Sequence, residues 1–374
     1  MRLRPVAILT VLLVVAASVP AGAASAGTTA SMATTQEDCS FPVTMTDASG
    51  TEVTLEERPD RVTTLLPSAA QTMWEIGGKS QVVGVTRYAS YLDGAESRTN
   101  VSAGYSISVE KVIGTEPDLV LAPNGTSQDT ITALRDAGIT VYSFELSGSI
   151  DDVRSKTTII GRLTGNCEGA ARTNAWMTAN VEAAREATAD VERPRVLYPL
   201  GGGYVANTNT FISEMIEVSG GQNVVGEANL TLAYPQVSDE VILELDPEVI
   251  VTTGSNAYLL SQEPYASTTA GQEGRTVRVD VNYLNQPAPR SVVYATRNLT
   301  TGFHPEAAES ADFVSKDEIT LATPTPTATA TDEPTATPTD VHTSTPTESG
   351  GQPGFGIVAA LAALASLGVL ARRE

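Results

Sequence analysis

The sequence predicts an α/β fold of two similar lobes, each with a mostly parallel sheet flanked by helices, joined by one long α-helix. Three observations lead to this prediction. Between residues 41 and 316, short runs rich in β-branched residues alternate with helical stretches, which is the pattern of parallel sheets covered by helices. One block of sequence occurs twice. A stretch without glycine or proline lies between the two copies.

The expected strands fall into two groups. The runs of the first group lie at 62–66, 82–85, 119–122 and 141–144, and those of the second group lie at 196–198, 249–252 and 277–279. Residues with a helical period lie between the strands, for example at 69–76 and 130–137. We therefore expect an N-terminal lobe at 41–165 and a C-terminal lobe at 194–320.

Two repeats in the sequence relate these lobes. Segment 110–120 matches segment 240–250: each begins with glutamate, carries a proline before the strand, and is preceded by a serine two positions earlier. Upstream, 77–84 matches 220–226 with one residue fewer. The same order of features occurs twice, which predicts two lobes of one architecture.

The stretch between the repeats favours a helix. Residues 170–191 are rich in Ala, Glu and Arg, which are good helix formers, and Pro194 ends the pattern. A helix of this length is roughly 30 Å long. We expect residues 166–193 to form a linking helix that acts as a rigid strut rather than as a hinge.

Both ends of the chain predict export and anchoring. Residues 1–26 combine two early arginines, an apolar run and small residues, as in a secretory signal peptide, and an N-terminal segment follows at 27–40. Residues 321–352, rich in Thr and Pro, predict an extended, O-glycosylated stalk. Residues 353–374 contain Pro-Gly-Phe, an apolar stretch and two arginines. They fit either a removed sorting signal or a permanent transmembrane helix, and both place the folded part outside the cell.

The composition excludes several classes of function. The chain has 44 acidic and 23 basic residues and a net charge of −21, which argues against a nucleic-acid partner because phosphate binding needs clustered Lys and Arg. The basic residues are nearly all arginines. Such an acidic, lysine-poor surface fits strong brine, and an ordinary acidic extracellular protein is the alternative. Two histidines and two cysteines exclude a Cys/His zinc cluster, and we expect no metal site.

Export also bears on covalent modification. Thiols tend to pair outside the cell, so we expect a Cys39–Cys167 disulfide, with two buried free thiols as the alternative. Four Asn-x-Ser/Thr sequons are candidate glycosylation sites. They begin at Asn100, Asn124, Asn229 and Asn298.

Four stretches of the chain resemble the substrate-binding proteins of ABC importers for cobalamin, ferric siderophores and haem. They are 61–70, 109–120, 220–224 and 234–240, and the resemblance covers roughly 41–313. It implies the class III periplasmic-binding-protein fold and a receptor that delivers a metal chelate to a membrane permease with its ATPase. No covalently bound cofactor is expected, and we expect a monomer.

The C-terminal order of stalk, Pro-Gly-Phe, apolar helix and Arg-Arg resembles the PGF-type sorting signal of halophilic archaea. In that family an archaeosortase removes the helix and attaches a lipid. The resemblance therefore implies a protein anchored by its C-terminus to the extracellular face of the cell membrane.

Candidate ligand contacts follow from the expected topology. Ligands of open α/β sheets lie beyond the carboxyl ends of the strands, so the loops after the strands should line a cleft between the lobes. Tyrosine recurs there and offers a flat chelate both an aromatic face and a hydroxyl, and ordinary packing is the alternative for each one. The candidates are Ser68, Arg87, Tyr88, Tyr105 and Asn124 in the first lobe, and Tyr204, Asn207, Tyr234, Ser255 and Arg290 in the second.

The resemblance implies a different role for Glu110 and Glu240. In the family, a glutamate at this place in each lobe pairs with arginines of the permease. The alternative is a glutamate that only complements the helix dipole, with Ser108 and Ser238 as helix caps.

The sequence contains no catalytic motif of the kinds Gly-x-Ser-x-Gly or His-Glu-x-x-His and no clear nucleophile–base set, so we expect no enzyme. A cell-surface hydrolase and a glycosylated adhesin are the alternative functions. The sequence does not choose among cobalamin, ferric siderophore and haem as the ligand.

Overall fold

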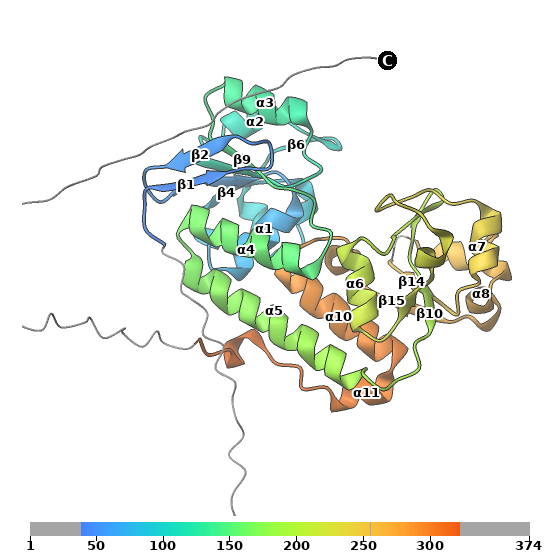
Figure 1. Ribbon diagram of the computed structural model, residues 1–374. Helices are drawn as coiled ribbons and strands as arrows, with labels where there is room; N and C mark the ends of the chain where they lie inside the picture. The colour runs from blue at the N-terminus through green and yellow to red at the C-terminus, as the bar shows by residue number, and fades with distance from the viewer. Residues whose placement is uncertain (1–38, 255, 322–374) are drawn as a thin grey trace, which may run out of the picture. The chain divides into compact units, whose positions relative to one another are not determined.

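Two parallel sheets form the centres of the two lobes in the computed structural model, which describes residues 39–254 and 256–321 (Figure 1). The strands of lobe 1 are β3 (Val62–Thr64), β4 (Val82–Val85), β5 (Thr99–Asn100), β8 (Leu119–Ala122) and β9 (Val141–Ser143). Those of lobe 2 are β10 (Arg195–Leu197), β13 (Gln222–Asn223), β14 (Val249–Thr252) and β15 (Thr276–Arg278). The orders are β5-β4-β3-β8-β9 and β13-β10-β14-β15, and all neighbours are parallel. The two sheets share one order, and lobe 1 has one more edge strand.

Helices flank both sheets, as the sequence predicted. In lobe 1 they are α1 (Pro67–Glu75), α2 (Val109–Ile113), α3 (Gln128–Asp136) and α4 (Ile150–Thr164). In lobe 2 they are α6 (Phe211–Val218), α7 (Asp239–Leu245), α8 (Thr269–Glu273), α9 (Val281–Leu284), α10 (Pro289–Phe303) and α11 (Pro305–Ser310). Three short antiparallel pairs complete the lobes: β1 (Val43–Thr46) with β2 (Glu52–Leu55), β6 (Ser102–Ala103) with β7 (Ser106–Ile107), and β11 (Pro199–Gly201) with β12 (Tyr204–Val205).

The core lies on both faces of each sheet. Along β8, Leu119 and Leu121 join one apolar cluster and Val120 joins the cluster on the opposite face. Along β14, Val249 and Val251 likewise face one cluster and Ile250 the other. Strands buried on both faces are continuous apolar runs, which is why the sequence located β8 and β14 correctly.

The internal repeat is also present in backbone detail. Glu116 and Asp246 occupy the same place in the two repeats, and both adopt left-handed φ angles, 44° and 34°. Two residues later, Asp118 accepts a hydrogen bond from the backbone N–H of Arg61 at 2.8 Å. Glu248 accepts the equivalent bond from Arg195 at 3.0 Å. The two lobes therefore repeat one architecture down to a turn and its anchoring hydrogen bond.

One long helix, α5 (Cys167–Ala187), links the lobes, and it ends a few residues before the predicted boundary. Helices α4 and α10 pack along it, so the link is a layer of three helices rather than a lone strut (Figure 1). Within this layer, Arg297 of α10 donates through its Nε to the Asn180 side chain at 2.9 Å. The sequence predicted α5 but missed α10.

The predicted disulfide is confirmed. Cys39 and Cys167 are bonded, with their Cα atoms 6.0 Å apart, and the bond attaches the N-terminal segment to the first residue of α5. The expected signal peptide, stalk, C-terminal sorting signal and transmembrane helix lie outside the described residues, as does Ser255. Within the described ranges, no helix is long and apolar enough to cross a membrane.

Candidate functional site

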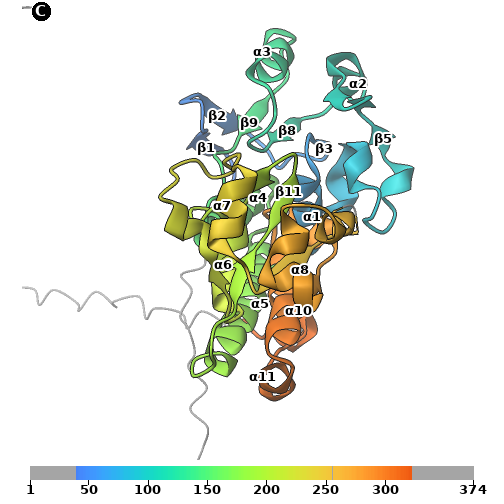
Figure 2. The same ribbon diagram turned by 90° about the vertical axis from the view of Figure 1, so that its right-hand side faces the viewer.

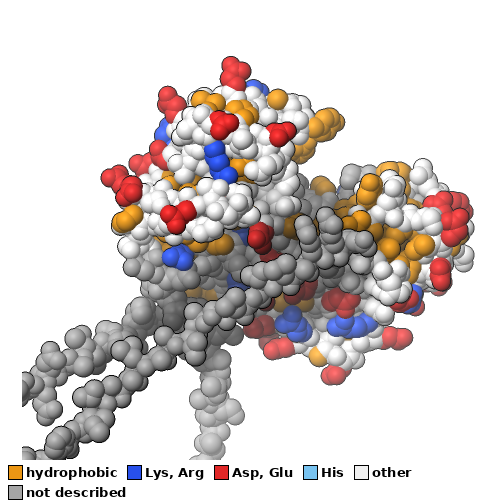
Figure 3. All heavy atoms as spheres, turned by 45° about the horizontal axis from the view of Figure 1, so that its top comes forward, with side chains coloured by type: hydrophobic (Ala, Val, Ile, Leu, Met, Phe, Trp, Pro, Cys, Tyr) orange, Lys and Arg blue, Asp and Glu red, His pale blue; other side chains and the backbone are white. Residues whose placement is uncertain are grey.

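Exposed large apolar side chains gather on the loops that follow the strands. We call these loops the strand-end surface. It comprises Tyr88, Tyr105 and Leu146 in lobe 1, and Tyr204, Leu230, Leu232 and Tyr258 in lobe 2. Figure 3 shows apolar side chains on the flanks of both lobes and acidic side chains spread over the outer surface. Groups of exposed apolar side chains are candidate binding sites.

Lobe 1 contributes a cation between two tyrosine rings. Arg87 and Tyr88 lie in the 3-10 turn that follows β4, and Tyr105 lies at the tip of the β6–β7 hairpin, 88% exposed. The Arg87 guanidinium carbon is 4.9 Å from the centre of the Tyr88 ring and 4.6 Å from that of Tyr105. A hydrogen bond with the Tyr88 hydroxyl raises the pKa of Arg87 above its ordinary value. The three predicted residues thus form one exposed cation–aromatic cluster.

Lobe 2 contributes a hairpin and the loop beside it. Tyr204 begins β12 and is exposed, while Tyr234 is half-buried, and this burial raises the pKa of its hydroxyl. Asn207 is fully buried, and its amide donates to the backbone oxygens of Leu230 and Leu232 at 2.8 and 2.9 Å. Contrary to the expectation of a direct ligand contact, Asn207 therefore supports the loop that presents these two leucines.

Ser68 and Asn124 differ in how accessible they are. Ser68 lies in the first turn of α1, is buried, and accepts a hydrogen bond on its backbone oxygen from the Thr72 hydroxyl at 2.8 Å. Burial removes its side chain from the surface where the sequence placed it. Asn124 is exposed directly after β8.

Sequence reasoning missed four members of the strand-end surface. They are Leu146, Leu230, Leu232 and Tyr258. Tyr258 follows β14 within a few residues, and Leu146 follows β9. For Leu146 and Tyr258 the signal was available, because each lies after a strand that the sequence predicted; Leu230 and Leu232 follow β13, a strand that the sequence did not predict. Three of the four are leucines, which carry no polar group that would mark them as ligand contacts in the sequence.

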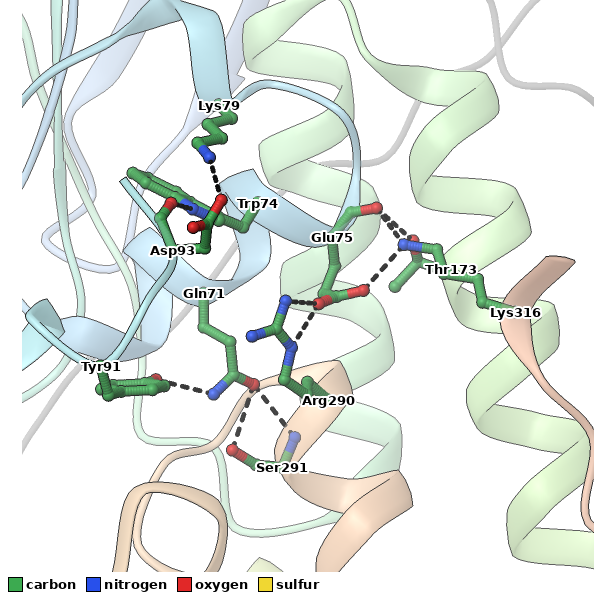
Figure 4. Close-up of polar contacts among 10 residues, drawn as sticks. All are labelled: Gln71, Trp74, Glu75, Lys79, Tyr91, Asp93, Thr173, Arg290, Ser291 and Lys316. Carbon is green, nitrogen blue, oxygen red and sulfur yellow. Dashed lines mark hydrogen bonds and ion pairs between the residues drawn. The ribbon is translucent and has the colours of Figure 1, made fainter. Parts of the chain in front are cut away.

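A polar chain joins the strand-end regions of the two lobes (Figure 4). Gln71 of α1 donates to the Tyr91 hydroxyl, in the segment after β4, at 2.8 Å. The same amide accepts from the backbone N–H of Ser291, at the start of α10, at 3.0 Å. The Ser291 hydroxyl in turn donates to the Asn282 carbonyl on α9 at 3.3 Å. Buried Gln71 therefore fixes the position of lobe 1 against lobe 2 at this point.

Arg290 is engaged in the same junction. Its guanidinium pairs with Glu75 at the end of α1, and Lys316 binds the other carboxylate oxygen at 2.8 Å. A cavity of about 400 Å³ lies beside this cluster, lined in part by Trp176 and Tyr283. The sequence expected Arg290 to contact a ligand, but its charge is already paired with Glu75.

The two predicted docking glutamates lie on equivalent helices. Glu110 of α2 and Glu240 of α7 are both exposed, each two residues after a serine cap. Ser108 accepts from the backbone N–H of Lys111 at 3.3 Å and Ser238 from that of Val241 at 3.5 Å. The cap interpretation of the serines is confirmed. Figure 2 shows α2 on lobe 1 and α7 on lobe 2.

The asparagines of the four sequons are all exposed. Asn100 lies in β5 and Asn124 after β8, Asn229 has a left-handed φ of 53°, and Asn298 lies within α10. Exposure is what glycosylation requires of the folded protein.

Comparison with known proteins finds relatives along the whole chain. A model of the periplasmic binding protein family matches residues 62–283, and a model of the PGF-CTERM motif matches residues 352–374. The cobalamin-binding protein of Halobacterium salinarum is 46% identical over 375 residues, covering 97% of each chain.

Solved structures give the same picture. The haem-binding protein RhuT from Roseiflexus sp. RS-1 aligns with a TM-score of 0.61 at 25% identity, over 67% of this chain and 99% of that one. The vitamin B12-binding protein BtuF of Vibrio cholerae aligns with a TM-score of 0.57 at 23% identity, over 67% and 98%. Both alignments extend over almost all of the known structure.

Proposed function

Because the chain belongs to the periplasmic binding protein family and ends in a PGF-CTERM motif, we propose that it captures cobalamin for an ABC importer. Like its relatives, the chain is a binding protein and not an enzyme. The ligand lies between the strand-end surfaces of the two lobes. The proposal rests on the exposed aromatic and aliphatic side chains of that surface together with the relative that binds cobalamin.

The chemistry of the strand-end surface suits a corrinoid. Cobalamin is a flat macrocycle rimmed by amides, and it carries one phosphodiester. Tyrosines 88, 105, 204 and 258 offer ring faces and hydroxyls, which can pack on a macrocycle and bond its amides. The exposed guanidinium of Arg87 supplies a cation for the phosphodiester.

Delivery requires a permease, and proteins of this family work with ABC permeases. We assign docking to Glu110 and Glu240, because the repeat places one exposed carboxylate on an equivalent helix of each lobe. A partner with two related halves can engage both lobes at once. Further support comes from the PGF-CTERM motif, which favours processing by an archaeosortase and a C-terminal anchor at the outer face of the membrane.

A thermal-shift screen in concentrated KCl tests the ligand assignment. The probes are cyanocobalamin, dicyanocobinamide, hemin and ferrichrome, applied to the folded part, residues 39–321. Cobalamin should raise the melting temperature, because a ligand that binds only the native state stabilises it. A shift with hemin or ferrichrome alone would assign the cleft to the other chelate class.

A further inference from the structure

Two exposed aliphatic side chains accompany the docking glutamates. Ile113 of α2 is 38% exposed and Leu243 of α7 is 44% exposed. Each lies three residues after the glutamate of its helix, and positions i and i+3 share one face of a helix. The same acidic and apolar pair therefore occurs on both lobes, at equivalent places in the repeat.

This repetition distinguishes the pair from ordinary surface residues. Single exposed apolar residues are common on soluble proteins. In the described part of the chain, however, the other large exposed apolar side chains lie in hairpins or in segments after strands, with Val281 on α9 and Tyr294 on α10 as the exceptions. The apolar core is already supplied by other residues of the two docking helices, Val109 and Val112 on α2 and Val241, Ile242 and Leu245 on α7. Nothing in the packing of either helix calls for an aliphatic side chain on its outer face.

A high salt concentration explains why an apolar residue would accompany each docking glutamate. The composition, with a net charge of −21 and few lysines, indicates a brine environment. At 1 M salt the Debye length is about 3 Å, so exposed carboxylate–arginine pairs are strongly screened. Burial of apolar area does not depend on charge and is not screened. A docking surface that works in brine therefore needs an apolar contact beside each ion pair.

We propose that Ile113 and Leu243 are the apolar anchors with which the protein docks on its ABC permease in concentrated salt. The occupant is one partner, the membrane permease, presenting an apolar site beside a cationic one to each lobe. The charge complementarity comes from Glu110 and Glu240, and the twofold repeat matches a partner with two related halves. This inference rests on the proposed function, because it assumes that α2 and α7 face a permease.

The test measures the affinity of residues 39–321 for the purified permease–ATPase complex of the importer in nanodiscs, by biolayer interferometry at 0.2 M and 3 M KCl. The variant Ile113→Ser/Leu243→Ser should weaken binding at least tenfold at 3 M KCl, because it removes an apolar contact from each lobe. The variant Glu110→Ala/Glu240→Ala should weaken binding at 0.2 M and much less at 3 M. Val281→Ser, which changes an equally exposed aliphatic residue at the start of α9, is the matched control and should bind as the wild type does.

Two results separate the inference from the proposed function. If the serine variant binds as the wild type does at 3 M KCl while the alanine variant loses binding at 0.2 M, the apolar anchors are refuted and the docking glutamates stand. If neither variant changes binding, docking on α2 and α7 is itself refuted. Melting temperature and cobalamin affinity serve as folding controls and should not change in either variant.

Discussion

Glu75 and Arg290 form an ion pair that joins the two lobes. Glu75 ends α1 of lobe 1, Arg290 begins α10 of lobe 2, and the Arg290 Nε donates to Glu75 Oε1 at 2.5 Å across 215 residues of sequence. Lys316 adds a second cation, and the Glu75 side chain is only 8% exposed (Figure 4). The lobes are therefore held together at this cluster as well as through α5, which favours a preformed site over a hinged one.

The variant Glu75→Gln should destabilise the fold. It leaves Arg290 and Lys316 without a carboxylate in a partly buried place. Removal of one member of a buried pair costs several kcal/mol, and because Arg290 is a quarter exposed we expect about 2 kcal/mol. Urea unfolding measures the loss, with the exposed Glu56→Gln as control. Equal stability of the two variants would show that the cluster does not hold the lobes.

Ligand binding should cause little closure of the lobes. The linking layer of α4, α5 and α10 and the Gln71–Ser291 contact resist hinge motion, and α5 carries no proline; its one glycine, Gly169, lies in the first turn. Small-angle scattering with and without saturating cyanocobalamin should give two radii of gyration that differ by no more than about 1 Å. A contraction of several Å would establish a hinge and overturn the strut interpretation of α5.

Much of this fold could be predicted from sequence because its signals are local. The buried strands β4, β8 and β14 lie where their apolar runs lie, and the serine caps precede their helices. The long helix α10 was missed even though its pattern is amphipathic, since its β-branched residues lower its intrinsic helix propensity. Pro289 in its first turn is a usual helix-start signal that could have located it.

The site was less predictable, because side-chain partners depend on tertiary contacts. Arg87, Tyr88 and Tyr105 were all predicted to lie on the same edge because they follow strands, and in the structure they are in contact. The partner of Arg290 lies 215 residues away, and Asn207 is oriented by carbonyls of a loop that has no regular structure. No local pattern in the sequence reports such pairings.

Loss of the disulfide should reduce stability substantially. The Cys39–Cys167 bond spans 128 residues, and closing a loop of that length in the unfolded chain contributes about 3–5 kcal/mol in the chain-entropy model. The double variant Cys39→Ser/Cys167→Ser should lose this amount in urea unfolding. Wild type treated with reductant is the control and should lose a similar amount. A loss below about 1 kcal/mol would show that the bond adds little.

Acid should weaken the fold in part through Asp47. Burial alone would raise the pKa of this carboxyl, but hydrogen bonds from Ser49, Ser143 and Thr51 lower it from 3.8 to about 2. The folded-state pKa lies below the unfolded one, so the contribution is present above pH 3.8 and is lost as the pH falls through about 2. We expect the free energy of unfolding to decrease as the pH is lowered from about 4 to about 2. This decrease should be about 2 kcal/mol smaller for Asp47→Asn than for wild type, and denaturant unfolding at several pH values measures it.

The exposed Asp136→Asn is the matched control for that comparison and should follow the wild-type pH profile. If the free energy of unfolding of Asp47→Asn declines between pH 4 and pH 2 as steeply as that of wild type, the stabilisation at Asp47 does not come from its ionised form.

The most direct test of the central claim is a calorimetric titration of residues 39–321 with cyanocobalamin in concentrated KCl. The account predicts one ligand per chain, and at least tenfold weaker binding for Tyr88→Ser/Tyr204→Ser, because each lost aromatic contact costs about 1 kcal/mol or more. Leu243→Ser, an exposed apolar change away from the strand-end surface, should bind cyanocobalamin with unchanged affinity. Absence of heat with cyanocobalamin, or equal affinity of the double tyrosine variant and wild type, would contradict a corrinoid site on the strand-end surface.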